Sequence, residues 1–263
     1  MRGVVNYFKL LYRYKDLFWQ LTFREIRARY KQSILGYFWA ILVPLVNLLV
    51  LSVVFSNLFR IPTGNTPYPI YLFVALVPWT FFTTSLSLAT SSVLANGSLI
   101  TKVSLPREIL PITAITARII DLILASLILL IFLIIYGVGL KLTLLYLPLI
   151  FLVQLMLMVG VSFFLSATNV FFRDIENVIG LLLMMWMYLT PIIYSPQLIP
   201  SHLQLLFYAN PMTAIINAYR EVVLFGTAPS WNLFTYSTLL SLIIFVSGYF
   251  YFKKRSKYFA DVM

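Results

Sequence analysis

Long runs without a charged side chain are the feature that most limits what this chain can fold into. Six such runs cover residues 34–59, 61–101, 122–140, 142–172, 177–219 and 222–252. A helix needs about 20 apolar residues to cross the hydrocarbon core of a bilayer, and several of these runs are longer than that. Charged residues make up 10% of the 263 residues, whereas a soluble domain is about one-quarter charged. We therefore expect an all-α membrane protein with several transmembrane helices.

The distribution of basic residues predicts how those helices cross the membrane. We expect six transmembrane helices, at about residues 36–59, 70–94, 110–137, 145–170, 177–195 and 232–252. With these spans, fifteen Lys and Arg residues fall on one side and three on the other. Because basic residues accumulate in cytoplasmic loops and termini, both termini are predicted to be cytoplasmic. Residues 1–33 then form a cytoplasmic N-terminus, residues 34–252 the six-span transmembrane domain, and residues 253–263 a basic cytoplasmic tail.

The segment 196–231 is apolar but contains too many prolines and glycines for a regular seventh span. A seventh span would also place the basic tail on the outer side, against the charge rule. We predict instead that residues 196–226 form an outer re-entrant hairpin of two short helices, broken near Asn210-Pro211. Irregular backbone at that depth is tolerated only where it is buried in protein or lines a wet cavity. The hairpin is therefore expected to rim an external opening.

The composition argues against several classes of site. The chain has no cysteine, so disulfides and thiolate metal sites are excluded. His202 is the only histidine, and a metal site or histidine-based catalysis would need partners that the sequence does not supply. No glycine-rich phosphate loop is present, so we expect no cofactor on this chain. The net charge of +11 comes from juxtamembrane clusters, which favour membrane lipids over nucleic acid as partners.

Residues 14–31 predict an amphipathic helix in the membrane interface, ahead of the first span. One apolar face carries Trp19, Phe23, Ile26 and Tyr30, the polar stripe beside it carries Gln20, Arg24, Arg27 and Lys31, and a smaller apolar patch carries Leu17, Leu21 and Ala28. A helix that floats in lipid needs only one apolar face. Two such faces predict lipid on one side and protein on the other. A plain basic anchor that sets the topology is the alternative, and both interpretations are compatible.

A second short helix is predicted in the loop between the second and third spans. Asn96-Gly97 breaks the preceding helix, and Ser98 is a candidate N-cap. Pro106 ends the new helix, which we place at residues 98–105. Its apolar residues, Leu99, Ile100 and Val103, recur at helical spacing. An apolar stripe presented to water indicates that another protein docks there.

Two groups of charged residues interrupt the apolar sequence at defined places. Arg118 and Asp121 lie three residues apart in the third span and so share one helical face. Either charge alone would be costly in the bilayer, so an ion pair is expected. It can belong to a substrate path or proton relay, or it can be a structural pair at a helix or subunit interface. Arg173 and Asp174 belong to the tight inner turn between spans four and five, which can also be an ordinary solvated turn.

Aromatic residues make up 17% of the chain and are locally dense around residues 37–39, 79–82 and 186–194. Most such rings form interfacial belts in membrane proteins. Rings with a polar edge also suit sugar chains, whose C–H faces lie against the aromatic face. The candidate channel aromatics are Tyr37, Trp39, Trp79, Phe82, Trp186, Tyr188 and Tyr194.

Six motifs follow one another between about residues 12 and 225. They are Tyr30-Lys31-x-Ser33-x-Leu35-Gly36-x-x-Trp39 leading to Pro44, Pro78-Trp79-x-Phe81-Phe82, Asn96-x-x-Leu99-Ile100-x-Lys102-Val103-x-x-Pro106-Arg107-Glu108-x-Leu110-Pro111, Phe172-Arg173-Asp174, Pro191-x-x-Tyr194 and Asn210-Pro211. Together they resemble the membrane subunit of type 2 ABC exporters. The most similar group exports polysaccharides such as O-antigen, teichoic acid and capsule.

The resemblance implies a homodimer of six-span subunits that pairs with two copies of a separate ATPase, which holds ATP and Mg. The amphipathic N-terminal helix, with Arg24, Arg27 and Lys31, and the first inner loop would contact that ATPase. This loop would contain the coupling helix, which would dock in a groove of the ATPase. The residues expected to couple the two proteins are Leu99, Ile100, Thr101, Lys102, Val103, Pro106, Arg107 and Glu108. The turn at Arg173 and Asp174 would lie nearby, and the outer hairpin would form gate helices. The aromatic groups would line or flank a glycan channel.

The sequence thus predicts the transport permease of an exporter for a lipid-linked polysaccharide in the bacterial cytoplasmic membrane. An exporter of a small hydrophobic drug or lipid is an alternative, because it would share this architecture. An integral-membrane enzyme acting on lipid-linked sugars is a second alternative, but it should show clustered acids, and the eight acids here are scattered. A non-transporting scaffold subunit is a third.

Overall fold

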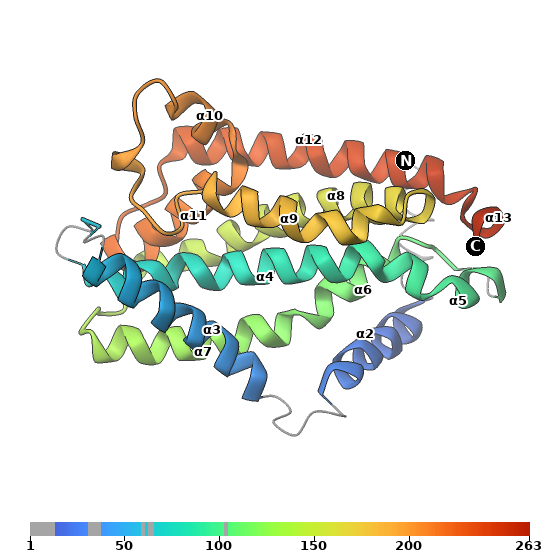
Figure 1. Ribbon diagram of the computed structural model, residues 1–263, viewed down its shortest axis with the longest axis horizontal. Coiled ribbons are helices and arrows are strands. Elements are labelled where there is room, and N and C mark those ends of the chain that lie inside the picture. Colours follow the sequence, from blue (N-terminus) through green and yellow to red (C-terminus); the bar gives the residue numbers. More distant parts are fainter. Residues whose placement is uncertain (1–13, 31–37, 59–60, 63–65, 103–104) are drawn as a thin grey trace.

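The computed structural model describes residues 14–30, 38–58, 61–62, 66–102 and 105–263. Across these ranges the chain is helical, and none of the residues described lies in a β-strand. Figure 1 shows the long helices running side by side, with α4 in the middle of the view. The all-α prediction is therefore confirmed for this part of the chain.

Within the ranges that the structure describes, four helical units are long and apolar enough to cross a membrane. They are α4 (Tyr68–Ala95), α6 with α7 (Ile109–Ala117 and Ile119–Ile135), the 3-10 turn η2 with α8 (Leu142–Tyr146 and Leu147–Phe171), and α12 (Trp231–Ser256). Two shorter helices occupy the places of the first and fifth expected spans. These are α3 (Phe38–Ser52), which continues into the π-helical turn η1 (Val53–Leu58), and α9 (Asp174–Tyr188).

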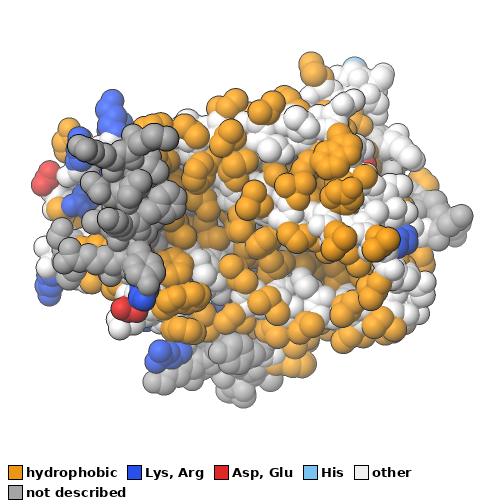
Figure 2. Space-filling model, turned by 180° about the vertical axis from the view of Figure 1, so that it is seen from behind, with side chains coloured by type: hydrophobic (Ala, Val, Ile, Leu, Met, Phe, Trp, Pro, Cys, Tyr) orange, Lys and Arg blue, Asp and Glu red, His pale blue; other side chains and the backbone are white. Residues whose placement is uncertain are grey.

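The exposed surface of the helices is largely apolar. Figure 2 shows hydrophobic side chains across the middle of one face, with Lys and Arg gathered mainly toward the left edge. On α7, the exposed residues Ile123, Leu127, Ile131 and Ile134 recur every three or four positions and so form one stripe. A stripe of large aliphatic side chains is stable in contact with lipid but not with water. The chain is accordingly a multi-pass membrane protein.

Helix α4 forms the centre of the fold because it is buried along most of its length. Residues from Ile70 to Phe82 are almost all buried, and α4 contacts α3, α6, α7, α8, α9 and α11. Beside it, α8 and α12 approach each other closely at two glycines. A Cβ on Gly248 would lie 2.3 Å from the carbonyl oxygen of Gly160, so no larger residue fits there without movement of the backbone. Small residues permit such close approach between membrane helices.

The expected third span, 110–137, is interrupted at Arg118. Helix α6 ends at Ala117 and α7 begins at Ile119. The backbone N–H of Arg118 donates to the carbonyl of Ile115 at 3.0 Å, which closes a tighter turn than the regular i to i−4 bond. The sequence contains no proline at this point, so the break is a difference from the expected continuous helix. It places the side chain of Arg118 at the junction of the two helices.

The segment after α9 contains the 3-10 turn η3 (Pro196–Leu198), α10 (Gln204–Ala209), α11 (Pro211–Arg220) and the π-helical turn η4 (Glu221–Phe225). The break between α10 and α11 falls at Asn210, where the sequence predicts it. The Asn210 side chain caps α11 by accepting from Met212 N–H at 3.0 Å. It also donates to Leu189 O at 3.1 Å, which ties the hairpin to the end of α9. Helix α11 is buried, whereas α10 is exposed.

Gly226 ends η4 with a left-handed φ of +68°, a conformation that glycine adopts without steric cost. The chain then turns into α12. At the far end of α12, a last short helix, α13 (Phe259–Val262), folds back beside α5 (Gly97–Lys102). We call this part of the molecule the α5 end; in Figure 1 it lies at the right, together with the turn between α8 and α9.

Candidate coupling site at the α5 end

Helix α5 follows α4 after a single residue, Asn96. It begins at Gly97 rather than at the predicted cap Ser98. Asn96 makes this abrupt turn possible because its side-chain amide donates to Ser92 O at 2.7 Å. The backbone N–H of Leu99 donates to Asn96 O at 3.0 Å, which starts the new helix. Val103, one of the predicted coupling residues, lies outside the described residues.

The prediction that α5 presents its apolar stripe to water is wrong. Ile100 is only 6% exposed, and Leu99 is partly buried in the same apolar cluster. The cluster also contains Phe252 of α12 and Phe259 of α13. The C-terminus covers α5 so closely that a Cβ on Gly97 would lie 3.3 Å from the sulfur of Met263. The apolar stripe is thus satisfied within the chain, and α5 exposes Ser98, Thr101 and Lys102 instead.

Pro106 and Glu108 face the interior of the α5 end, and Arg107 lies at its edge. Pro106 is buried and Arg107 is half-buried, with its guanidinium 5.8 Å from the ring centre of Phe259. Glu108 is 1% exposed and forms an ion pair with the ammonium group of Lys253 on α12. This pair links the start of α6 to the end of α12. The Glu108 carboxylate is buried, so loss of this ion pair would be costly, and these residues hold the α5 end together.

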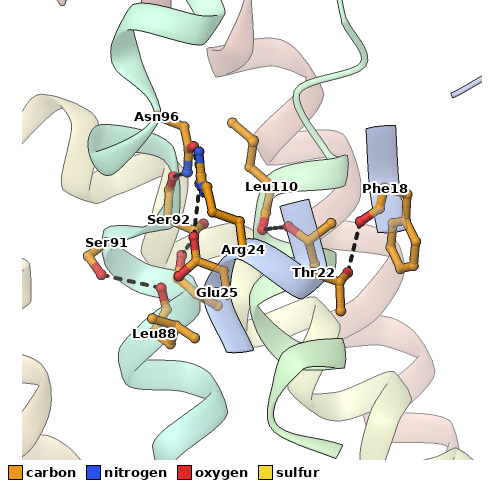
Figure 3. Close-up of polar contacts among 11 residues, drawn as sticks. Phe18, Thr22, Arg24, Glu25, Leu88, Ser91, Ser92, Asn96 and Leu110 are labelled. Atoms are coloured by element: carbon orange, nitrogen blue, oxygen red, sulfur yellow. Dashed lines mark hydrogen bonds and ion pairs between the residues drawn. The ribbon is translucent and has the colours of Figure 1, made fainter. Parts of the chain in front are cut away.

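Helix α2 (Lys15–Tyr30) is joined to the α4–α5 turn by Arg24. Figure 3 shows the Arg24 guanidinium reaching the side chain of Asn96, to whose Oδ1 it donates at 2.6 Å. The same guanidinium pairs with Glu25 at 2.9 Å. Arg27 is exposed on the same helix, and Lys31 lies outside the described residues. Of the three predicted interface residues, Arg24 therefore connects α2 directly to the residue that sets the direction of α5.

Helix α2 has two apolar faces, with membership that differs from the expected one. Trp19 and Phe23 are about half exposed, and Leu21 packs in the cluster of Ile100. Ile26, which we expected on the lipid-facing stripe, is 7% exposed and packs against Ala117 of α6. Ala28, which we expected to face protein, is exposed. The protein-facing side is centred nearer Thr22, a buried residue whose hydroxyl donates to Phe18 O within α2 (Figure 3).

Arg118 and Asp121 form an ion pair at 3.3 Å, as the spacing of three residues predicts. A third residue, Arg29 of α2, lies closer to the carboxylate, with its Nη1 at 2.6 Å from Asp121 Oδ2. The cluster therefore joins α2 to the break between α6 and α7. The position of Arg29 indicates that it faces protein, because Arg29 lies seven residues after the buried Thr22 and therefore on the same side of α2. The apolar residues of α2 by themselves do not indicate this contact.

The turn between α8 and α9 is short, since α8 ends at Phe171 and α9 begins at Asp174. Arg173 and Asp174 are both exposed there. The side chain of Asn169 stabilises the turn through two hydrogen bonds. Its Oδ1 accepts from Glu176 N–H at 3.1 Å, and its amide donates to Thr90 O of α4 at 3.1 Å. The exposed turn is thereby tied to the central helix.

The candidate channel aromatics fall into two groups. Phe82 is completely buried and Trp79 is 3% exposed, so Phe82 does not line a channel in this conformation. Phe82 packs edge-to-face against Trp186, with the two ring centroids 5.2 Å apart. The indole N–H of Trp186 donates to Asn210 Oδ1 at 2.9 Å. These rings hold α4, α9 and the hairpin together.

The remaining aromatics are more accessible. Trp39 is 45% exposed and Tyr188 is 54% exposed. Tyr194 is half-buried, and its hydroxyl donates to Tyr188 O at 2.6 Å. Tyr37 lies outside the described part of the chain. Among the candidate aromatics in the described part of the chain, Trp39 and Tyr188 are thus the most exposed.

A buried arginine in the hairpin was not among the predicted site residues. Arg220 is 2% exposed, and its guanidinium lies 3.8 Å from the ring centre of Tyr71. It donates to Pro191 O and Ile192 O at 2.5 Å each, and to Tyr71 O at 3.3 Å. Arg220 is one of the three basic residues that the predicted topology places on the outer side. The side chain instead fixes the loop after α9 against α4.

Residues 16–224 match the family model described as ABC-2 type transporter, which covers most of the chain. The chain belongs to the ABC-2 type transporter family. The resemblance in the motifs is thereby confirmed. The α5 end contains the loop that the resemblance predicts to be cytoplasmic and to contact a separate ATPase.

Curated relatives match over nearly the full length of this ABC-2 type chain. The O-antigen export system permease protein RfbA of Klebsiella pneumoniae is 29% identical over 249 residues, which is 94% of this chain and 95% of the relative. The RfbA protein of Myxococcus xanthus is 28% identical over 253 residues, covering 95% and 96%. The polysialic acid transport protein KpsM of Escherichia coli is 25% identical over 242 residues, covering 90% and 92%.

Proposed function

We propose that this chain is the permease subunit of an ATP-driven exporter that carries a lipid-linked polysaccharide across the bacterial inner membrane. Membership of the ABC-2 type family supports transport driven by a separate ATPase. The names of the relatives, which refer to O-antigen export and polysialic acid transport, support a polysaccharide as the substrate. The permease would supply no chemistry of its own, and ATP and Mg would be held by the partner.

The proposed topology has six spans with both termini in the cytoplasm. Helix α3 with η1 covers Phe38–Leu58, which at about 1.5 Å per residue matches a hydrocarbon core about 30 Å thick. Helix α9 has 15 residues and reaches only about 22 Å. Local thinning of the bilayer or burial in a dimer would accommodate it. The exposed aliphatic residues of α3 and α9 support a homodimer in which two copies enclose the path of the glycan.

The observation that carries the proposal is the junction of Arg24 and Asn96 at the α5 end. Asn96 is the last residue before α5 and is bonded to α4, while Arg24 bonds it to α2. A partner that pushes on the exposed side of α5 would therefore move α4 and α2 together. Because α4 is the central helix, that displacement would reach the helices that contact it, including α3 and α9.

The exposed face of α5 supports a polar contact with the ATPase, whereas the sequence predicts an apolar one. Thr101 and Lys102 are exposed on α5, and Arg173 and Asp174 are exposed at the neighbouring turn. These are polar and charged side chains, so the docking surface would be hydrophilic. Ile100 would support α5 from inside rather than insert into the partner.

A cysteine crosslink tests the proposed partner contact. The chain contains no cysteine, so Thr101→Cys introduces a unique thiol on the exposed face of α5. We expect it to crosslink to a co-expressed ATPase that carries cysteines around its docking groove, and to do so with a different yield when ATP is bound. Leu142→Cys, at a residue that is 87% exposed on the opposite end, is the matched control and should give no crosslink. Equal yields at both positions would contradict the proposal.

A further inference from the structure

A polar cavity lies among the elements of the hairpin, which is at the opposite end of the molecule from α5 (Figure 1). The cavity has a volume of about 650 Å³, within the range of about 300–1,000 Å³ that is typical of small-ligand sites. Its walls come from the chain before α4, the start of α4, the hairpin and the start of α12. We call it the hairpin cavity. The proposed topology places it on the outer side of the membrane.

Three polar side chains in the wall of the hairpin cavity form no hydrogen bond to another residue that the structure describes. They are Gln197 of η3, Tyr208 of α10 and Asn217 of α11. Tyr208 and Asn217 are half-buried, and polar groups removed from water normally have a hydrogen-bond partner. Amide and phenol groups can both donate and accept. The cavity therefore offers donors and acceptors from three elements to a ligand that carries both.

The two charged residues in the described wall of the hairpin cavity have opposite signs. Arg220 donates three of its N–H groups to backbone carbonyls, and an arginine has further N–H groups to donate. The carboxylate of Glu221 accepts from the N–H of Ser230 at 2.8 Å and from its hydroxyl, and each carboxylate oxygen keeps another lone pair. Because one positive and one negative charge cancel, the cavity favours an uncharged polar ligand over an ion.

Aromatic side chains complete the wall and favour a sugar among uncharged polar ligands. Tyr208 is half-buried and Phe225 is 50% exposed, and both line the cavity. The C–H faces of a sugar ring pack against such rings, while its hydroxyls reach polar groups at the edge. A hydrocarbon chain would also contact the rings. It would, however, leave the amide of Asn217 and the carboxylate of Glu221 without water and without a partner, which is costly.

We propose that the hairpin cavity binds a short saccharide segment of the exported glycan on the outer side of the membrane. Asn217 and Glu221 would hydrogen-bond to sugar hydroxyls, and Tyr208 would lie against a ring face. The inference rests on the proposed function, because it takes the glycan as the substrate, and it adds a receiving site on each subunit. A segment held there has to leave the cavity before the chain can slide back, so binding would favour outward movement.

The test is protection of a single thiol in the purified full-length protein in nanodiscs. The chain has no cysteine, and Thr227 is an exposed residue of the cavity wall, so Thr227→Cys reports on the cavity. Its reaction with a charged methanethiosulfonate reagent is timed with and without the oligosaccharide that mild acid releases from the surface glycan of the producing cells. We expect the oligosaccharide to slow the reaction severalfold. His202→Cys, on the same hairpin but outside the cavity wall, is the control reporter and should react at an unchanged rate.

A second substitution tests the assigned residue. Asn217→Leu keeps a side chain of similar size but removes the amide, so half-protection of Thr227→Cys should need about tenfold more oligosaccharide. Asn232→Leu is the matched control, because Asn232 is exposed on α12 and does not line the cavity. It should leave the required concentration unchanged.

Four results would overturn the proposal. An unchanged rate at Thr227→Cys up to the solubility limit of the oligosaccharide would show that the cavity takes no sugar. Equal slowing at His202→Cys would show general shielding of the hairpin. Protection that survives Asn217→Leu would place the sugar elsewhere, and equal protection by decanol would assign the cavity to a hydrocarbon chain. The reaction contains no ATPase, so its failure is distinguishable from failure of the crosslink at Thr101→Cys that tests the proposed function.

Discussion

Arginine side chains hold together two regions of this protein in different ways. In the hairpin, Arg220 is buried and its guanidinium donates to three backbone carbonyls, at Tyr71, Pro191 and Ile192. At the inner junction, Arg24, Arg29 and Arg118 are more exposed and bind side chains, namely Asn96 and Asp121. Carbonyl groups of the backbone cannot swing away from their partner, whereas side chains can. The hairpin is therefore built as a fixed anchor, and the α2 junction as a joint that can rearrange.

The largest expected effect is at the anchor. Arg220→Met leaves three buried carbonyl groups without their donor, and each unsatisfied buried group costs about 1–3 kcal/mol. We expect the free energy of unfolding to fall by about 4 kcal/mol, measured by thermal unfolding of the detergent-solubilised protein. Arg220→Lys should lose less, because the ammonium group keeps the charge and part of the hydrogen bonding. Arg173→Met, at an exposed turn, is the control, and an equal loss there would contradict the anchor role.

A medium effect is expected where α13 covers α5. Phe259 is completely buried against Ile100 and Phe252, so Phe259→Ala removes a large side chain from a packed cluster. The cost should be about 2–3 kcal/mol, below that of a central core position, because a chain end can relax into the cavity. Hydrogen exchange should rise in α5 and α13 but not in α11. Phe250→Ala, at a position that is 66% exposed on α12, should change neither, and unchanged exchange in Phe259→Ala would disprove the cover.

The smallest effect on stability is expected at the joint itself. Arg24→Gln removes the bond to Asn96 at a half-exposed side chain, so the free energy of unfolding should fall by about 1 kcal/mol or less. If the joint couples α2 to α5, substrate export in the assembled transporter should nevertheless fall severalfold. Arg27→Gln is the matched control and should export normally. A large loss of stability in Arg24→Gln with unchanged export would show that Arg24 acts as an anchor and would contradict its role in a joint.

The residues of the coupling site illustrate how far sequence reasoning reaches. The short helix after Asn96, the turn at Arg173 and the break at Asn210 follow from local signals, because proline, glycine and asparagine act on the backbone within a few residues. The pairing of Arg118 with Asp121 follows from their spacing on one helix. The burial of Ile100 does not, because its cover is Phe259, at the other end of the chain.

The sequence by itself determined that this is a helical membrane protein of a transporter family. Uncharged runs, helical periodicity and short motifs are local properties of the sequence, so they can be recognised without knowledge of the fold. Only the tertiary structure decided that α5 is covered by the C-terminus, that Arg29 reaches Asp121, and that Arg220 is an anchor. Those contacts join residues 28 to 159 positions apart. A hydrogen bond or an apolar contact depends on position in space, and at such separations the packing of the whole bundle sets that position.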